Sequence, residues 1–284
     1  MSSAIQQTFT IGGDMTVHRL GFGAMRITGQ GIWGWPPDRA RSKDLLRRVV
    51  ELDIDLIDTA DAYGPETSEY LIAEALVPYP DRLVIATKGG LVRGGPGSWV
   101  SDGRPEHLER AVANSLRRLQ RERIDLYQLH TIDEDVPVKE SLGALERMQK
   151  AGKIRHVGVS NFRVEHLERA REIVEVVTVQ NRYNLADRKH EPVVDYCTEH
   201  GIGFIPWFPL STGDLARDDR LRTIAERYGA TASQIALAWL LRRSPVILPI
   251  PGTSTIAHLE QNTGARDIAL SDEDYATLNQ MTDS

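Results

Sequence analysis

The chain has very little cysteine and no recognisable metal-binding motif. Its 284 residues include one cysteine, Cys197, which excludes an internal disulfide and suits a reducing compartment. Cys197 lies in 191–201, where the apolar spacing predicts an amphipathic helix, so a small core residue is favoured over a nucleophile. The eight histidines form neither an H-E-x-x-H motif nor a Cys/His ligand spacing, and we therefore predict no metal site.

An excess of positive charge and a long apolar run are also missing. The formal net charge is -6, and lysine and arginine are scattered, which argues against a nucleic-acid partner. No apolar stretch approaches the roughly 18 to 20 residues that a membrane span needs, and the first ten residues do not resemble a secretory signal. We expect a cytoplasmic protein that contacts neither membrane nor nucleic acid, with a small neutral or anionic ligand.

Short apolar runs alternate with helical patterns along the chain. A hydrophobic content of 41% is enough for a large core. The runs are rich in Val, Ile and Leu and largely lack polar alternation, which predicts strands buried on both faces. They occupy 83–89, 125–130, 154–161, 176–181, 201–207 and 246–252, and the clearest helical patterns are 105–120, 139–152 and 164–174.

The spacing of polar residues at the strand ends predicts a (β/α)8 TIM-type barrel. A barrel uses about 31 residues for each strand and helix. Asp58, Lys88, His130, Ser160, Gln180 and Trp207 are separated by 30, 42, 30, 20 and 27 residues. We predict one domain over 1–284 with no internal linker. An open sheet that binds a dinucleotide is the alternative, but "GFGAMR" (21–26) lacks the third glycine of G-x-G-x-x-G.

The stretch "DLIDTADAYG" (55–64) places two aspartates and a tyrosine just after an apolar strand. A carboxylate in such a position needs a partner. The C-terminal ends of barrel strands converge, so Asp58, Tyr63, Lys88 and His130 are predicted to meet there. A lysine ammonium would lower the tyrosine pKa, the aspartate would hold the lysine, and the histidine would donate a hydrogen bond to a substrate oxygen. Taken singly, each residue could instead be structural.

Several motifs together resemble the signatures of the aldo-keto reductases. They are "IDTADAYG", "ATKGG", "LYQLH" and "LERMQKAGKIRHVGVSNF", and the resemblance runs from about residue 10 to the end. It implies a (β/α)8 barrel with an N-terminal β-hairpin and extra C-terminal helices, which binds NADPH across its mouth and reduces aldehydes or ketones. Asp58, Tyr63, Lys88 and His130 match the catalytic tetrad, with Tyr63 as the general acid.

The same resemblance implies a cofactor-binding set. Ser160, Asn161 and Gln180 match residues that bind the nicotinamide carboxamide, and Trp207 matches the aromatic residue that stacks on the nicotinamide ring. Pro209, Leu210 and Ser211 match the segment that passes the pyrophosphate. Thr253 and Ser254 match the loop that holds the 2′-phosphate, and Gln261 and Asn262 match residues that face the adenine. Asn161 and Gln180 could instead satisfy loop backbone. Gly252 stands where a lysine is frequent and His258 where an arginine is usual, so NADPH is expected and NADH stays possible.

Two loops rich in glycine and proline are predicted to form the substrate wall. Residues 27–42 and 89–106 carry Trp33, Trp35 and Trp99, which could line a pocket or pack on the barrel rim. Within the family, "GFGAMRITGQGIWGWPPDR" and "PWFPLS" resemble a bacterial branch that includes pyridoxal reductases, which suggests a ring aldehyde as the carbonyl substrate. Oxidation of a sugar or polyol and a nucleotide-sensing regulatory subunit are the alternatives. A monomer is expected by default.

Overall fold

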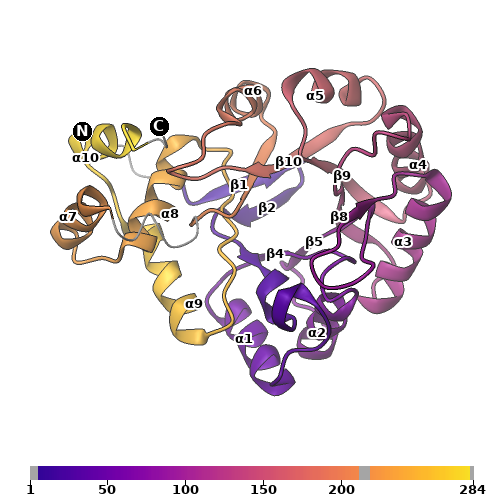
Figure 1. Ribbon diagram of the computed structural model, residues 1–284, viewed down its shortest axis with the longest axis horizontal. Helices are drawn as coiled ribbons and strands as arrows, with labels where there is room; N and C mark the ends of the chain where they lie inside the picture. Colours follow the sequence, from indigo (N-terminus) through magenta and orange to yellow (C-terminus); the bar gives the residue numbers. More distant parts are fainter. Residues whose placement is uncertain (1–5, 211–217, 282–284) are drawn as a thin grey trace.

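The core of the protein is a curled parallel sheet. The computed structural model describes residues 6–210 and 218–281. In Figure 1 the strands lie at the centre and helices surround them. Seven strands hydrogen-bond in the order β11-β10-β9-β8-β5-β4-β3. Their bounds are β3 (Phe22–Gly23), β4 (Leu56–Asp58), β5 (Val84–Gly89), β8 (Ile124–Leu129), β9 (Ile154–Ser160), β10 (Val176–Arg182) and β11 (Gly203–Trp207).

Residues 246–250 close the sheet into a barrel. The Leu248 N–H donates to the Phe204 carbonyl in β11 at 2.8 Å, and the Gly21 N–H, just before β3, donates to the Pro249 carbonyl at 2.8 Å. This segment therefore occupies the place of the eighth strand, which confirms the predicted (β/α)8 barrel. It makes only an isolated bridge with β11, because Pro249 has no N–H to donate to a ladder.

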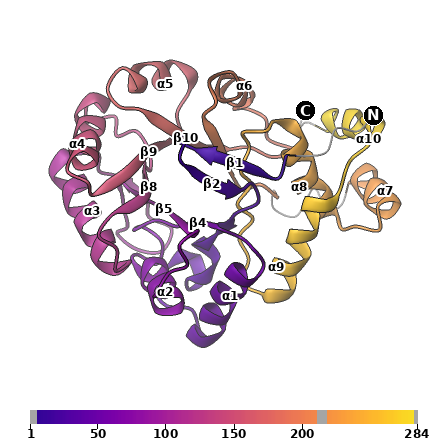
Figure 2. The same cartoon turned by 180° about the vertical axis from the view of Figure 1, so that it is seen from behind.

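Helices cover the outside of the barrel, as Figures 1 and 2 both show. The predicted helices at 105–120, 139–152 and 164–174 correspond to α3, α4 and α5. The helix bounds are α1 (Arg39–Glu51), α2 (Thr67–Leu76), α3 (Pro105–Arg118), α4 (Val138–Lys150), α5 (Val164–Arg171), α6 (Glu191–His200), α7 (Asp219–Arg227), α8 (Ala232–Arg243), α9 (Ile256–Thr263) and α10 (Asp272–Asn279). Cys197 is fully buried in α6.

The sequence of α3 explains why it forms a surface helix. Pro105 stands in the first turn, where its missing N–H costs nothing. Two arginines in the last turn interact favourably with the negative end of the helix dipole. Leu108 and Val112 are four residues apart and are both buried on the face that packs on the barrel.

An antiparallel hairpin, β1 (Thr8–Ile11) and β2 (Met15–His18), covers the end of the barrel opposite the C-terminal strand ends. Figure 2 shows it lying across the barrel centre. Its apolar residues share one buried cluster with side chains from the strands: Ile11, Met15 and Val17 pack with Leu56, Val84, Leu126, Ile205 and Leu248. The hairpin therefore seals that end, and the opposite end stays available for a site.

None of the helices in the described ranges combines the length and the apolar content that a membrane crossing would need.

Arg19 joins the barrel closure to the outer helices. Its side chain is buried, and its guanidinium donates to the carbonyls of Ile247 at 3.1 Å, Leu241 at 2.8 Å and Ser244 at 2.5 Å. Burial lowers the Arg19 pKa to about 10, which still leaves the group charged at neutral pH. One side chain thus satisfies carbonyls at the end of α8 and in the closing segment.

We expect Arg19→Met to lower the free energy of unfolding by about 3 kcal/mol, because it leaves several buried carbonyls without a hydrogen-bond donor. Arg19→Lys should lose less, since an ammonium still reaches some of them. Urea unfolding of the three proteins measures the differences. A loss below about 1 kcal/mol for Arg19→Met would show that this clamp does not hold the closure.

Candidate active site

A buried ion pair lies at the C-terminal ends of two neighbouring strands. Lys88 Nζ in β5 is 2.7 Å from Asp58 Oδ2 in β4, and the two side chains are 0% and 2% exposed. The ammonium also donates to the Thr59 carbonyl at 2.8 Å and to the Tyr63 hydroxyl at 3.3 Å. All three of its N–H groups therefore have acceptors. Burial alone would lower the Lys88 pKa, but the charge of Asp58 and these hydrogen bonds outweigh it and raise the pKa.

The second oxygen of Asp58 is held by two amides. Gln180 Nε2 lies 2.8 Å and Gln128 Nε2 3.2 Å from Asp58 Oδ1. Gln180 was predicted as a carboxamide ligand, and here its N–H group is used by the carboxylate. Gln128 was not predicted to belong to the site. Its signal was present, because Gln128 interrupts an apolar strand and stands two residues before His130, on the same face.

Tyr63 lies in the loop between β4 and α2 and is 7% exposed. Its hydroxyl contacts the Lys88 ammonium, as the sequence suggested. Burial raises the Tyr63 pKa, and the positive charge of Lys88 offsets this only in part. The expectation of a lowered pKa is therefore wrong for this structure, because desolvation outweighs the ammonium. The hydroxyl stays protonated at neutral pH, which is the state that a proton donor needs.

His130 follows β8 directly and faces Tyr63. The two rings are 6.0 Å apart between centroids and meet edge to face. Burial, with the positive charge of Lys88, lowers the His130 pKa well below its usual value, so the imidazole is neutral. Its Nδ1 is buried and has no hydrogen-bond partner among the described residues. Two neutral donors, Tyr63 and His130, thus lie beside the Lys88–Asp58 ion pair.

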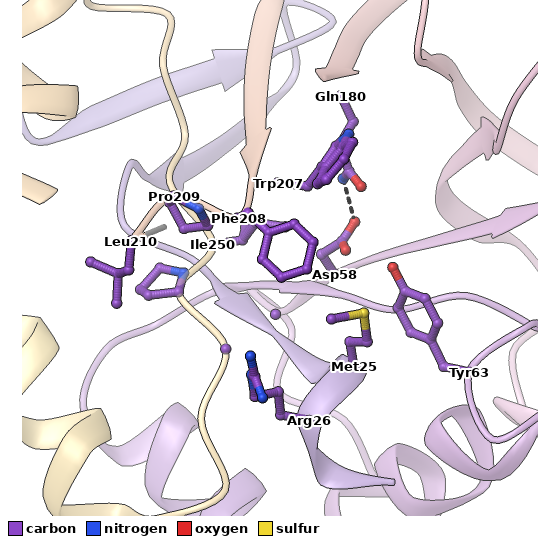
Figure 3. A pocket seen from close by; sticks show the side chains of 13 residues that line it. Met25, Arg26, Asp58, Tyr63, Gln180, Trp207, Phe208, Pro209, Leu210 and Ile250 are labelled. Atoms are coloured by element: carbon purple, nitrogen blue, oxygen red, sulfur yellow. Dashed lines mark hydrogen bonds between the residues drawn. The ribbon is translucent and has the colours of Figure 1, made fainter. Parts of the chain in front are cut away.

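A cavity opens next to these residues at the mouth of the barrel (Figure 3). Asp58, Tyr63 and Gln180 form one side of it. Of the residues predicted to bind cofactor, Trp207, Pro209, Leu210 and Gly252 also line it. Ser211, predicted with the pyrophosphate segment, lies outside the described residues.

Asn161 connects two of the predicted contacts. Its backbone has a φ of 62°, a left-handed conformation that asparagine tolerates well. Its Nδ2 donates to the His130 carbonyl at 3.2 Å, and its Oδ1 accepts from Trp207 Nε1 at 3.1 Å. Ser160 Oγ donates to the Gln180 carbonyl at 2.8 Å. These polar groups are thus fixed before any ligand binds.

The C-terminal loop places Thr253 and Ser254 just before α9. Thr255 is the N-cap, and its side chain accepts from the His258 N–H at 3.3 Å. Asn262 is buried, whereas His258 and Gln261 lie on the exposed part of the helix. This arrangement presents a helix N-terminus beside the cavity, a position that favours an anion.

Gly252 and Arg26 form a pair of neighbours in the cavity wall. A Cβ at Gly252 would lie 2.8 Å from the Gly23 carbonyl oxygen, so the backbone approach leaves no room for the lysine frequent at that place. Arg26, from the short helix η1 (Ala24–Ile27), lines the same cavity and is labelled in Figure 3. Arg26 was not predicted to belong to the site. A cation three residues after G-x-G at a strand end was the available signal.

The three tryptophans separate in the structure. The Trp99 ring lies 6.5 Å from Tyr63 and 6.4 Å from His130, edge to face with both. Trp33 makes a backbone bridge with Gly64, next to Tyr63. Trp35 is 43% exposed and packs on Tyr70 of α2, so it does not join the ring cluster around Tyr63. The packing of Trp35 on α2 agrees with the alternative of a tryptophan on the barrel rim, and Trp33 and Trp99 stay candidates for the substrate wall.

Comparison with known proteins agrees with this geometry. A model of the aldo/keto reductase family matches residues 19–283. The chain belongs to the aldo/keto reductase family. Membership makes it an oxidoreductase, and it confirms the resemblance seen in the sequence motifs.

Three relatives of this aldo/keto reductase are informative. An uncharacterized oxidoreductase from Schizosaccharomyces pombe is 51% identical over 269 residues, covering 94% of this chain and 88% of that protein. Pyridoxine 4-dehydrogenase from Escherichia coli is 41% identical over 281 residues, covering 97% and 98%. The crystal structure of an aldo/keto reductase from Klebsiella pneumoniae, in complex with NADP and acetate, superposes with a TM-score of 0.83 at 29% identity, covering 98% and 95%.

Within the described ranges, no three His, Cys, Asp or Glu side chains are grouped so that they could hold a metal ion.

The depressed pKa of His130 predicts a pH effect on stability. In the unfolded chain a histidine titrates near 6.5, so below that pH the unfolded state binds a proton that folded His130 refuses. Stability is therefore lost as the pH falls. Between about pH 7 and 5 we expect the free energy of unfolding to fall more steeply in wild type than in His130→Gln, by up to about 1.4 kcal/mol per pH unit. Urea unfolding across this range tests it, and parallel slopes would contradict the assignment.

Proposed function

We propose that the protein uses NADPH to reduce an aldehyde or ketone to the alcohol, with Tyr63 as the general acid. The observation that carries this proposal is the fully buried, charged Lys88 held between Asp58 and the Tyr63 hydroxyl. A cation there stabilises the phenolate that a proton-donating tyrosine leaves behind. Without such a role, a buried ion pair would be a costly feature of a barrel mouth.

The residues of the mouth fit a nicotinamide dinucleotide. Trp207 offers an aromatic face. Ser160, Asn161 and Gln180 are each oriented by a hydrogen bond within the protein, and we assign their remaining hydrogen-bonding capacity to the carboxamide. The Gly23–Gly252 backbone approach keeps this part of the cavity wall free of a side chain at 252, and the α9 N-terminus with Thr253 and Ser254 suits a phosphate. The Klebsiella pneumoniae structure, titled as a complex with NADP, supports this cofactor for the family. When bound, NADPH supplies the hydride that reaches the carbonyl carbon.

The side chains of the chain then act on the carbonyl oxygen. Tyr63 and neutral His130 each donate a hydrogen bond to it, which polarises the carbonyl and fixes its orientation. As negative charge develops on the oxygen, the Tyr63 proton moves to it and completes the alcohol. The positive Lys88 stabilises the phenolate, and Asp58 keeps Lys88 in place with Gln128 and Gln180 as its own supports. The proton is later regained from water.

A planar ring aldehyde such as pyridoxal is our proposed substrate. Trp99 stands edge to face with both Tyr63 and His130, so an aromatic surface on which a flat ring can pack adjoins the two proposed hydrogen-bond donors. The 41% identity with a protein named pyridoxine 4-dehydrogenase supports the same substrate class. That name also supports a second candidate, oxidation of an alcohol by the same residues, since hydride transfer is reversible.

Tyr63→Phe should lower turnover about 10²- to 10⁴-fold, because the proton donor is lost while the ring stays in place. The decisive experiment follows NADPH and NADH consumption against a panel of aldehydes and ketones that includes pyridoxal. NADPH binding, read by fluorescence, should be unchanged in the variant. Full turnover by Tyr63→Phe would refute the general acid, and a wild-type enzyme active only with alcohols and the oxidised cofactor would favour the second candidate.

We propose further that Arg26 contacts the cofactor diphosphate. It supplies a cation to the cavity wall next to Gly252, where a lysine side chain has no room. Arg26→Gln should weaken binding of NADPH and NADH alike by about tenfold, because a charge-assisted hydrogen bond is lost. Arg39→Gln, which removes a surface pair with Glu74, is the matched control and should bind both normally. Dissociation constants from fluorescence titration decide the matter. Weaker binding of NADPH alone would move the contact to the 2′-phosphate, and no change would exclude Arg26.

A further inference from the structure

A small hairpin beside the mouth carries both Arg93 and Trp99. Strands β6 (Leu91–Val92) and β7 (Val100–Ser101) pair antiparallel, so residues 93–99 form the loop between them. This loop contains three glycines and a proline. A glycine-rich loop has many accessible conformations and needs contacts to hold it in one. The position of Trp99 is therefore not fixed by the hairpin alone.

Arg93 supplies contacts to three separate segments. Its Nε donates to the Ser98 carbonyl at 2.7 Å, across the hairpin loop. Its Nη1 donates to the carbonyls of Ile32 and Ala62, both at 3.1 Å, and its Nη2 to that of Gly31 at 3.4 Å. Gly31 and Ile32 belong to the predicted substrate loop 27–42, and Ser98 belongs to the hairpin loop 93–99. Ala62 is the residue before Tyr63. Four of the five guanidinium N–H groups are thus used by backbone carbonyls.

The same guanidinium stacks on the aromatic wall. Its central carbon lies 3.7 Å from the centre of the Trp99 ring and 5.5 Å from that of Trp33. Trp99 in turn meets the rings of Tyr63 and His130 at its edge. A continuous set of contacts therefore runs from the carbonyls of three segments, through Arg93 and Trp99, to the reacting groups.

We propose that Arg93 is a positioning residue that fixes Trp99 over Tyr63 and His130, and thereby selects planar aromatic carbonyl substrates over small aliphatic ones. The proposal rests on the proposed function, because Tyr63 and His130 define where the carbonyl lies. A lysine cannot replace Arg93, since an ammonium has three N–H groups, no planar face to stack, and no fork that reaches separate carbonyls.

An anion-binding role for Arg93 is the competing explanation. A guanidinium at the edge of a substrate site could pair with a carboxylate or phosphate of the ligand. Here the donors are already occupied by carbonyls, which leaves one N–H for a ligand. The positioning role therefore predicts that neutral and anionic aromatic aldehydes respond equally to a change at Arg93.

The first test compares Arg93→Lys with wild type on benzaldehyde, a carboxylate-substituted benzaldehyde and propanal. We expect kcat/KM for both aromatic aldehydes to fall roughly 10- to 100-fold, mostly through KM, because a displaced Trp99 no longer packs against the aromatic ring of the substrate. Propanal kinetics and the NADPH dissociation constant should stay within about twofold. Loss confined to the anionic aldehyde would establish anion binding instead, and an equal loss with propanal would show a general structural role.

Arg188→Lys is the matched control. Arg188 likewise donates to two carbonyls, those of Leu278 and Asn279, and lies 4.6 Å over the ring of Trp239. It makes these contacts with α8 and α10, away from the hairpin loop. The same substitution there should leave aromatic selectivity unchanged. A similar loss of selectivity in this control would overturn the specific role of Arg93.

A double-mutant cycle with Trp99→Ala tests whether Arg93 acts through Trp99. Once Trp99 is removed, Arg93→Lys should change aromatic kcat/KM by less than about twofold, since its target is gone. An undiminished effect in that background would refute the proposal.

A readout without substrate separates this proposal from the proposed function. The emission of Trp99 is obtained as the difference in fluorescence between a protein and its Trp99→Phe counterpart. We expect acrylamide to quench this emission more strongly in Arg93→Lys than in wild type. If wild type reduced no carbonyl at all, the proposed function would fail while this measurement still reported on Arg93. Quenching that does not change would show that Arg93 does not hold Trp99.

Discussion

The buried pair of Lys88 and Asp58 is the constraint on which the rest of the site depends. Removing two charges from water costs several kcal/mol for each ion, and their attraction repays this only when every remaining donor and acceptor is satisfied. The barrel provides that satisfaction from four strands. β4 and β5 carry the pair, while β8 and β10 carry the amides of Gln128 and Gln180 that bind the free carboxylate oxygen. Only a closed, convergent arrangement brings four strand ends to one carboxylate.

The same desolvation has opposite consequences for neighbouring groups. Desolvation fails to neutralise Lys88, because Asp58 is 2.7 Å away. It keeps Tyr63 protonated, because burial raises the Tyr63 pKa by more than the neighbouring Lys88 ammonium lowers it, and together with the charge of Lys88 it keeps His130 neutral. The result is an ammonium, paired with the Asp58 carboxylate, next to two neutral hydrogen-bond donors. A pattern of this kind is complementary to an oxygen that gains negative charge during a reaction and is not complementary to an oxygen that is already an anion.

Sequence reasoning recovered the features that depend on periodicity and spacing. Buried strands, the helices between them and the meeting of Asp58, Tyr63, Lys88 and His130 all follow from alternation and from the convergence of strand ends. It missed features that depend on three-dimensional competition. The net pKa of Tyr63 required the degree of burial as well as the neighbouring charge, and Trp35 could be separated from Trp99 only when the loops were placed. Gln128 and Arg26 were missed although the sequence carries a signal for each, a polar residue within an apolar strand and a cation shortly after G-x-G.

Two arginines at the mouth show why residue type alone does not assign a role. Arg93 donates four N–H groups to backbone carbonyls and stacks its planar face on Trp99, so most of its contacts are made within the protein. Arg26 instead lines the open cavity, beside Gly252, which carries no side chain. The guanidinium is the same in both places, and the surrounding acceptors decide whether it organises a wall or faces a bound anion. Under the proposed function, Arg93 would therefore belong to the substrate end of the mouth and Arg26 to the cofactor end, because backbone carbonyls satisfy the first guanidinium and the second faces the cavity.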